Sequence, residues 1–225
     1  MSRVSPVHRP WYSRAWYALL QRILQLAAVL GWGVRHFGHE NIPRDGGVLV
    51  VSNHQSHLDP PLVGMGCPRR MNYLARESLF RFWLFRWLIR SLDAIPIDRE
   101  GLGLSGIKES LRRLKRGEMV LVFPEGTRTP DGEIASFKPG FTTLAVRSGA
   151  WILPVAVNGA FQAWPRCQLL PHSGHVEVYY APPISPEQVK RMSERELLAE
   201  VERRVRAGHR QLREQDSAGV AHFLA

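Results

Sequence analysis

The chain has 225 residues, enough for one α/β domain with a full hydrophobic core. It carries 30 Lys and Arg residues against 20 Asp and Glu residues, for a net charge of +10 and an isoelectric point near 10.4. A basic balance of this size predicts an anionic partner such as nucleic acid, anionic lipid or a phosphorylated metabolite. The sequence contains no low-complexity tract and no internal repeat, which argues against a disordered chain or a repeat array.

Two cysteines, Cys67 and Cys167, lie far apart and outside any C-x-x-C spacing. This usage indicates a reducing compartment and neither a zinc site nor a disulfide scaffold. Arginines interrupt the first apolar segment and no small-residue cleavage site follows it, so a signal peptide is not expected.

Residues 11–34 form the longest apolar stretch, interrupted by Arg14, Gln21, Arg22 and Gln25. The most apolar piece, 23–34, contains only Gln25 as a polar residue and is shorter than the roughly 20 residues that cross a bilayer. At 100° per residue the four polar side chains fall within an arc of about 100°, and apolar side chains fill the rest. We favour a helix lying in one leaflet with its cationic ridge toward the headgroups, and keep a core helix packed on the domain as the alternative. Residues 1–37 are therefore expected to form an amphipathic membrane-associating segment.

A second aromatic stretch, residues 79–90, alternates Phe, Trp and Leu with arginines. It suits a membrane interface or an acyl-chain groove, and a buried helix with snorkelling arginines fits equally well.

Strand and helix signals alternate through the remaining chain. Strands are expected at 48–52, 72–75, 94–97, 119–123, 151–157 and 175–180, and helices after Asp59 and at 105–116, 140–148 and 194–214. Pro96 indicates an edge or strand-end position, and the last, heavily charged helix is expected to be solvated. The alternation predicts a three-layer α/β domain over residues 38–215, with a mixed, largely parallel sheet flanked by helices and a tail at 216–225.

Three polar residues, His54, Arg99 and Glu125, each follow a predicted strand. We expect them to converge, because ligands in open α/β sheets bind beyond the carboxyl ends of the strands. His54 and Asp59 can pair only if the chain turns between them, and Asp59 as helix N-cap would supply that turn. A carboxylate on one imidazole nitrogen leaves the other to act as a general base. Two ordinary loop residues remain the alternative, and His57 is a rival base.

The segments Ile97-Asp98-Arg99 and Glu125-Gly126-Thr127-Arg128 resemble an anion cradle. Arginine forks match phosphate oxygens, Gly126 permits close backbone approach, and the hydroxyl of Thr127 adds a donor. Glu125 is expected to orient an arginine or a substrate hydroxyl instead of binding phosphate.

No Gly-x-Ser-x-Gly elbow is present and neither cysteine has an activating neighbour, so direct transfer is favoured over a covalent acyl-enzyme. Residues 101–106 match G-x-G-x-x-G, but Asp98 and Glu100 precede the glycines where a dinucleotide fold needs a tight turn and would face a pyrophosphate. A dinucleotide site is therefore a minor alternative.

Four blocks in order resemble the lysophosphatidic acid acyltransferase family of glycerolipid acyltransferases. They are Asn53-His54 with Asp59, residues 95–99 (IPIDR), residues 123–128 (FPEGTR) and residues 152–157 (ILPVAV), with residues 137–140 (FKPG) between the last two. The resemblance covers about residues 38–182.

The resemblance implies transfer of a fatty acyl group from an acyl thioester to the hydroxyl of lysophosphatidate. His54 would be the general base and Asp59 its orienting partner, while the acceptor phosphate would be held by Arg99, Glu125, Gly126, Thr127 and Arg128. Pro154 and Val155 would shape the acyl pocket.

The implied partners are a membrane surface with anionic lipid, a lysophospholipid acceptor and acyl-CoA or acyl carrier protein, with no nucleic acid, metal or other cofactor. The implied location is the cytoplasmic face of a membrane, monotopic or peripheral. Another lysolipid or glycerol 3-phosphate remains an alternative acceptor. A basic nucleic-acid-binding protein is the alternative from another class, although arginines scattered among apolar residues do not form one polar stripe.

Overall fold

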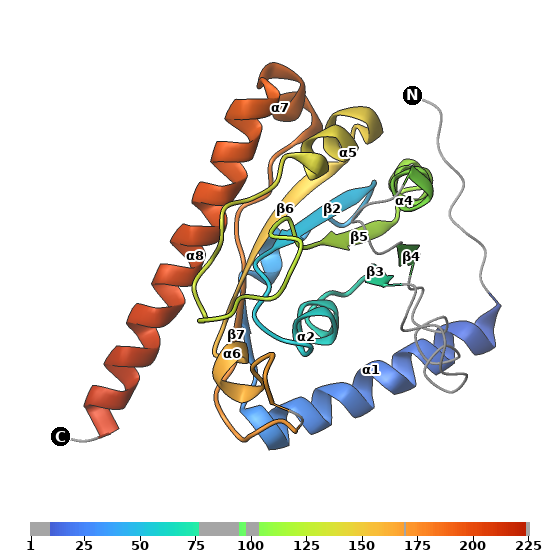
Figure 1. Cartoon of the computed structure of the whole chain (residues 1–225). Coiled ribbons are helices and arrows are strands. Elements are labelled where there is room, and N and C mark those ends of the chain that lie inside the picture. Colours follow the sequence, from blue (N-terminus) through green and yellow to red (C-terminus); the bar gives the residue numbers. More distant parts are fainter. Residues whose placement is uncertain (1–9, 77–94, 98–103, 169, 224–225) are drawn as a thin grey trace.

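Within the part of the chain that the structure describes, the strands form one seven-stranded sheet. The computed structural model describes residues 10–76, 95–97, 104–168 and 170–223 (Figure 1). The strands are β1 (Arg35–Phe37), β2 (Val48–Ser52), β3 (Met71–Arg76), β4 (Ile95–Ile97), β5 (Met119–Val122), β6 (Trp151–Asn158) and β7 (Glu177–Tyr180). Their order is β1-β7-β6-β2-β5-β3-β4, and every neighbouring pair is parallel except β6 with β7. The predicted mixed, largely parallel sheet is confirmed.

Helices cover both faces of this sheet (Figure 1). They are α1 (Trp11–Trp32), α2 (Asp59–Met65), α4 (Leu104–Lys115), α5 (Gly140–Ser148), α6 (Ala160–Ala163), α7 (Pro186–Arg191) and α8 (Glu194–Phe223), with a 3-10 turn at His39–Asn41. Along β2, Val48 and Val50 pack in a core with α2, whereas Leu49 and Val51 pack in a second core with α4, α5 and α8. Since successive strand residues point to opposite faces, a fully apolar strand is buried on both, which produces the three layers.

Pro96 lies in β4, at the edge of the sheet. This position was predicted, because proline has no backbone N–H to donate to a neighbouring strand. The aromatic stretch 79–90, Arg99 and the glycines of 101–103 lie outside the described residues.

Helix α1 exists where it was predicted, but its orientation toward the domain differs. The amide N–H groups of Gln21 and Gln25 donate to carbonyls at the end of α2 and just beyond it, so these two members of the polar ridge face inward. Large apolar side chains point outward instead, namely Trp11, Tyr12, Leu19, Ile23, Leu26 and Leu30. The physical reason is that the last carbonyls of a helix need donors from outside it, and glutamine supplies them. Across the described residues, no helix is both long and apolar enough to cross a bilayer.

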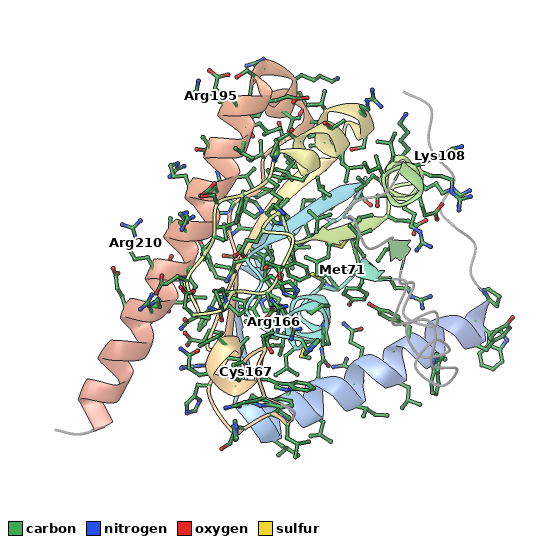
Figure 2. All side chains as sticks on the ribbon, in the orientation of Figure 1. Met71, Lys108, Arg166, Cys167, Arg195 and Arg210 are labelled. Carbon is green, nitrogen blue, oxygen red and sulfur yellow. The ribbon has the colours of Figure 1, made fainter. Side chains whose placement is uncertain are left out.

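Helix α8 also differs from its prediction. Its 30 residues run to Phe223; Leu197, Val201 and Val205 are buried in the second core, and Leu212 is also buried. These positions recur at helical spacing, so one stripe enters the core while charged residues such as Arg195 and Arg210 point away (Figure 2). The expectation of a merely solvated helix was therefore wrong for this face.

Candidate active site

The loops after β2 and β5 meet at the carboxyl edge of the sheet. These two strands are parallel neighbours, so the residues that follow Ser52 and Val122 emerge side by side. The backbone N–H of His54 donates to Glu125 Oε1 at 2.7 Å, and the backbone N–H of Thr129 donates to the His54 carbonyl at 2.8 Å. The predicted convergence of His54 and Glu125 is therefore observed.

His54 and Asp59 form a hydrogen-bonded pair. The distance from His54 Nδ1 to Asp59 Oδ2 is 2.7 Å. The same oxygen accepts the backbone N–H groups of Gln55 and Ser56 at 2.6 and 2.8 Å. Asp59 is fully buried, while the His54 side chain is 18% exposed. With Nδ1 donating to the carboxylate, a neutral His54 presents Nε2 as a proton acceptor.

Asp59 produces the turn by a route that differs from the prediction. It is the first residue of α2, whose N-cap is Leu58, and it makes no N-cap bond to its own helix. Its carboxylate instead gathers the amides of the preceding loop. The turn follows from those bonds, and the partial positive charge of the helix N-terminus favours the carboxylate there.

The His54 imidazole also stacks on Phe123, the residue that follows β5. The ring centroids lie 4.0 Å apart with an interplanar angle of 15°. Ring stacking and the Asp59 bond together fix the orientation of the imidazole. His57, the rival base, is exposed, and its ring lies 5.4 Å from that of Trp164.

Three residues to which the sequence assigned no role, Asn53, Gln55 and His209, hold the loop in place. The Asn53 side chain pairs with both backbone polar groups of Val157 on β6, at 2.8 and 2.9 Å. The Gln55 amide contacts the Gly132 carbonyl and His209 Nε2, both at 3.2 Å. Gln55 lies inside the His54–Asp59 motif and Asn53 directly precedes it, so their position was a usable signal. His209 lies on charged α8, where periodicity gives no such signal.

His209 is 5% exposed, and burial lowers its pKa to about 4. The neutral ring can therefore accept the Gln55 N–H, and the Oε1 atom of Gln55 accepts the Phe161 backbone N–H at 3.3 Å. Through Gln55, the motif loop is joined to α6, to α8 and to the loop at Gly132.

Glu125 has partners other than those expected. Its two carboxylate oxygens accept the backbone N–H groups of His54 and Ala135, at 2.7 and 2.9 Å. Burial raises the pKa of this carboxyl, and the two amide bonds act in the opposite direction. The residue ties two loops together and shapes the site through the backbone.

Two cationic side chains, Lys138 and Arg128, lie at the turn beside the motif loop, which we call the entrance of the site. Gly126 has φ +75°, and a Cβ there would lie 2.9 Å from Lys138 Nζ, so the amine reaches over this glycine. Arg128 is half-buried, whereas Thr127 is exposed at the same turn. Burial and then the charge of Arg128 lower the pKa of His57, which brings Arg128 close to the motif loop. An electropositive entrance of this kind favours an anionic ligand.

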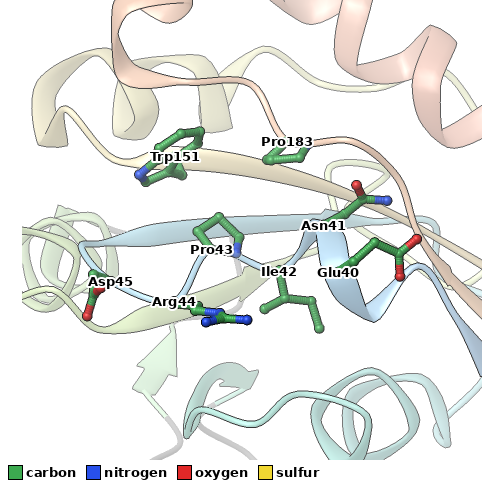
Figure 3. Close-up of a pocket in the computed structure, with 8 residues that line it drawn as sticks. All are labelled: Glu40, Asn41, Ile42, Pro43, Arg44, Asp45, Trp151 and Pro183. Atoms are coloured by element: carbon green, nitrogen blue, oxygen red, sulfur yellow. The ribbon is translucent and has the colours of Figure 1, made fainter.

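Pro154 and Val155 lie inside the sheet, opposite Val51 and Ser52, and both are buried. They support the base of the loop that carries His54. A hollow of about 440 Å³ lies at the other end of the sheet (Figure 3), where Trp151 begins β6 and Pro43 and Asp45 precede β2. It is remote from the His54–Asp59 pair and belongs to a different surface.

Comparisons with known proteins agree with this geometry. Residues 13–158 match a family model described as Acyltransferase. The chain belongs to this family. It is 33% identical over 144 residues to the 1-acyl-sn-glycerol-3-phosphate acyltransferase of Bacillus subtilis, covering 64% of this chain and 71% of that protein. It is 35% identical over 153 residues to the Pseudomonas aeruginosa enzyme of the same name, covering 67% and 58%.

The structural comparison extends this agreement to the whole domain. The crystal structure of the 1-acyl-sn-glycerophosphate acyltransferase PlsC from Thermotoga maritima superposes with a TM-score of 0.80 at 30% identity, covering 92% of this chain and 84% of that one. The resemblance drawn from the sequence blocks is confirmed. This acyltransferase therefore carries its His54–Asp59 pair on the fold of the lysophosphatidic acid acyltransferases.

Proposed function

We propose that this acyltransferase moves a fatty acyl group from an acyl thioester to the free hydroxyl of lysophosphatidate, giving phosphatidate. The observation that carries the proposal is the His54–Asp59 pair at 2.7 Å, beside a cationic entrance. A base held by a buried carboxylate suits activation of a hydroxyl, and the cations suit a phosphate.

The reaction proceeds by direct transfer. His54 Nε2 takes the hydroxyl proton as the acceptor oxygen attacks the thioester carbonyl and forms the new C–O bond. The tetrahedral oxyanion then collapses, the C–S bond breaks, and the imidazolium returns its proton to the departing thiolate. Asp59 stabilises the imidazolium between the two steps and keeps the ring in the productive tautomer.

Arg128 and the turn at Gly126 and Thr127 are proposed to hold the acceptor phosphate, with Arg99 completing the cradle. Lys138 joins this group because its ammonium lies over Gly126. Arginine supplies paired N–H donors to phosphate oxygens, whereas lysine acts as a point charge.

The outward face of α1 supports action at a membrane surface. Leu26 and Leu30 are 62% and 78% exposed, and Trp11 is 79% exposed. A row of apolar side chains on one helix face is typical of helices that lie in the interface of a bilayer, and the charge of +10 favours anionic lipid. We propose that α1 lies in the cytoplasmic leaflet and that the acceptor reaches His54 from the same surface.

The decisive experiment follows thiol release from acyl-CoA in the presence of anionic vesicles and a panel of acceptors. Lysophosphatidate is expected to give the fastest release, and His54→Ala is expected to lower kcat by about 1000-fold or more. His57→Ala is the matched control: it removes an imidazole from the same loop that lacks the Asp59 bond, and a loss below about tenfold is expected. Retained turnover in His54→Ala would contradict the assigned base, and a faster acceptor lacking phosphate would contradict the assigned cradle.

A further inference from the structure

Helix α2 carries the carboxylate that orients the base, yet it has only seven residues. A helix this short has little stability of its own, so its position depends on what holds its ends. Its first residue, Asp59, binds His54 and the loop amides. Whatever holds the other end of α2 therefore contributes to the placement of the His54 imidazole.

The carbonyl end of α2 is held by side chains from three other elements. The last carbonyls of a helix have no partner inside it. Here the Leu62 carbonyl binds His36 Nε2 of β1 at 2.9 Å, and the Val63 carbonyl accepts the Tyr180 hydroxyl of β7 at 2.7 Å.

Helix α1 supplies the remaining donors at this end. Gln25 Nε2 donates to the Met65 carbonyl at 2.7 Å. Gln21 Nε2 lies 3.2 Å from the carbonyls of both Met65 and Cys67. Arg22 donates to Gln25 Oε1 at 3.2 Å, which fixes the amide with its N–H groups toward α2.

These two glutamines lie on the face of α1 opposite its exposed apolar side chains. Gln21 and Gln25 are half-buried against α2, whereas Ile23 and Leu26 are exposed. One side of the helix thus touches the α2 that carries Asp59, while the other side is the surface assigned above to the bilayer.

We propose that Gln21 and Gln25 are positioning residues that couple the seating of α1 to the geometry of the His54–Asp59 pair. The proposal rests on the proposed function for its physiological meaning, because α1 is assigned there to the membrane. When α1 is seated, its amides hold the carbonyl end of α2 and so keep Asp59 at hydrogen-bonding distance from His54. Catalytic competence then depends on the same helix that docks the enzyme on lipid.

The test replaces the donors without changing side-chain size. In Gln21→Glu/Gln25→Glu, carboxylates would face the carbonyl end of α2, where the helix dipole disfavours negative charge. We expect kcat on vesicles to fall by about tenfold or more with KM changed less than about twofold, because orientation of the base is lost while acceptor binding is kept. Amide hydrogen exchange at Gln55 and Ser56, whose N–H groups bind Asp59, is expected to accelerate.

Two further variants guard against a trivial loss of folding. Arg22→Gln/Gln25→Lys keeps N–H donors toward α2, avoids a second cation beside Arg22, and adds a charge that the carbonyl end favours, so kcat is expected to stay within about threefold of the unmodified protein. Gln25→Met is the neutral isostere without donors and is expected to show the kinetic and exchange changes of the double Glu variant in weaker form.

The matched control lies on the other face of the same helix. Leu26→Gln/Leu30→Gln is expected to weaken vesicle binding while leaving exchange at Gln55 and Ser56 unchanged. Unchanged kcat and unchanged exchange in both the double Glu and the Met variants would overturn the coupling. Absence of thiol release from the unmodified protein with every acceptor would instead overturn the proposed function, and the exchange comparison would still decide whether the glutamines position Asp59.

Discussion

Helices α1 and α8 pack against opposite faces of the sheet and display opposite amphipathicity (Figure 1). Helix α8 buries an apolar stripe that includes Val201 and exposes arginines such as Arg210. Helix α1 turns Gln21 and Gln25 inward and exposes Leu26 and Leu30. The same protein thus has one helix built for contact with water and one whose outer face favours an apolar medium. The two helices therefore differ in the direction of their polar face relative to the sheet.

Both helices nevertheless contact the segment that carries the His54–Asp59 pair. His209 of α8 contacts Gln55 from one side, and Gln25 of α1 holds the far end of α2 from the other. Changes on the inner faces of the two helices should therefore affect stability or catalysis. Changes on the outer face of α1 should alter vesicle binding, whereas changes on the outer face of α8 should have little effect on stability.

The largest effect is expected for a charge placed on the inner face of α8. Val201→Asp buries a carboxylate at a fully buried position without a designed partner, so the free energy of unfolding should fall by about 4 kcal/mol. Arg210→Asp, on the outer face, should change it by less than about 0.5 kcal/mol. Urea unfolding of the two variants measures the contrast, and equal effects would mean that α8 is not anchored by its stripe.

A pH-dependent effect of similar size is expected at His209. Burial and the nearby Arg213 lower its pKa to about 4 from 6.5, while Glu133 acts in the opposite direction. The unfolded chain therefore binds the proton first as pH falls. Neutral His209 makes its full contribution to the free energy of unfolding above pH 6.5. This contribution declines as the pH falls toward about 4, and the total loss across that window is roughly 3 kcal/mol. The difference in unfolding free energy between the unmodified protein and His209→Gln should shrink across this window, and a constant difference would contradict the assignment.

On the outer face of α1, the change should appear in lipid binding and not in folding. Leu26→Gln/Leu30→Gln removes two leucines that are exposed on the protein. Vesicle binding should weaken by about 100-fold, because each leucine that enters the bilayer contributes about 1.5 kcal/mol or more to the binding free energy. The thermal midpoint should stay within about 2 °C, since these side chains contact little of the domain. Vesicle sedimentation measures the binding and a thermal scan measures the midpoint. A lowered midpoint with intact vesicle binding would mean that Leu26 and Leu30 stabilise the domain and do not bind lipid.

The smallest effect is expected for the ion pairs on the outer side of α8. Glu200 bonds Arg203 and Arg204, and the Arg203 bond first of all lowers the pKa of Glu200 to about 2. Since Arg203 is 65% exposed, solvent screens the interaction. Glu200→Gln should therefore lower the unfolding free energy by no more than about 1 kcal/mol, and by less still in 0.5 M salt.

Much of the fold was predictable because the buried strands are continuous apolar runs. Val48–Ser52 and Trp151–Val157 read as strands from composition alone, and the expected bounds differ from the observed ones by about one residue. The meeting of His54 and Asp59 was also predictable, since a helix start was expected at Asp59-Pro60. The bonds that create the turn were not, because they run backward to loop amides that only the folded chain brings together.

The direction in which α1 faces could not be obtained from its own periodicity. A polar arc looks the same whether it meets headgroups or another helix, and the carbonyls of Met65 and Cys67 that bind Gln21 and Gln25 become neighbours only in three dimensions. His209 was missed for a related reason, since its partner Gln55 lies 154 positions away in sequence.

The Asn53 side chain has a consequence for how the enzyme can vary. Its side-chain amide bonds the backbone N–H and C=O of Val157 just beyond the last backbone pair of β2 with β6. The side chain thus replaces the backbone in the pairing, and the main chain of Asn53 can turn toward His54. The distance from the sheet to the His54 imidazole is thus set by the length of one side chain. Inserting a residue between Ser52 and His54 would move the imidazole by about 3.3 Å along the strand direction, well beyond the roughly 1 Å that catalytic alignment tolerates. Length changes in relatives of this enzyme should therefore accumulate in outer loops and spare this junction.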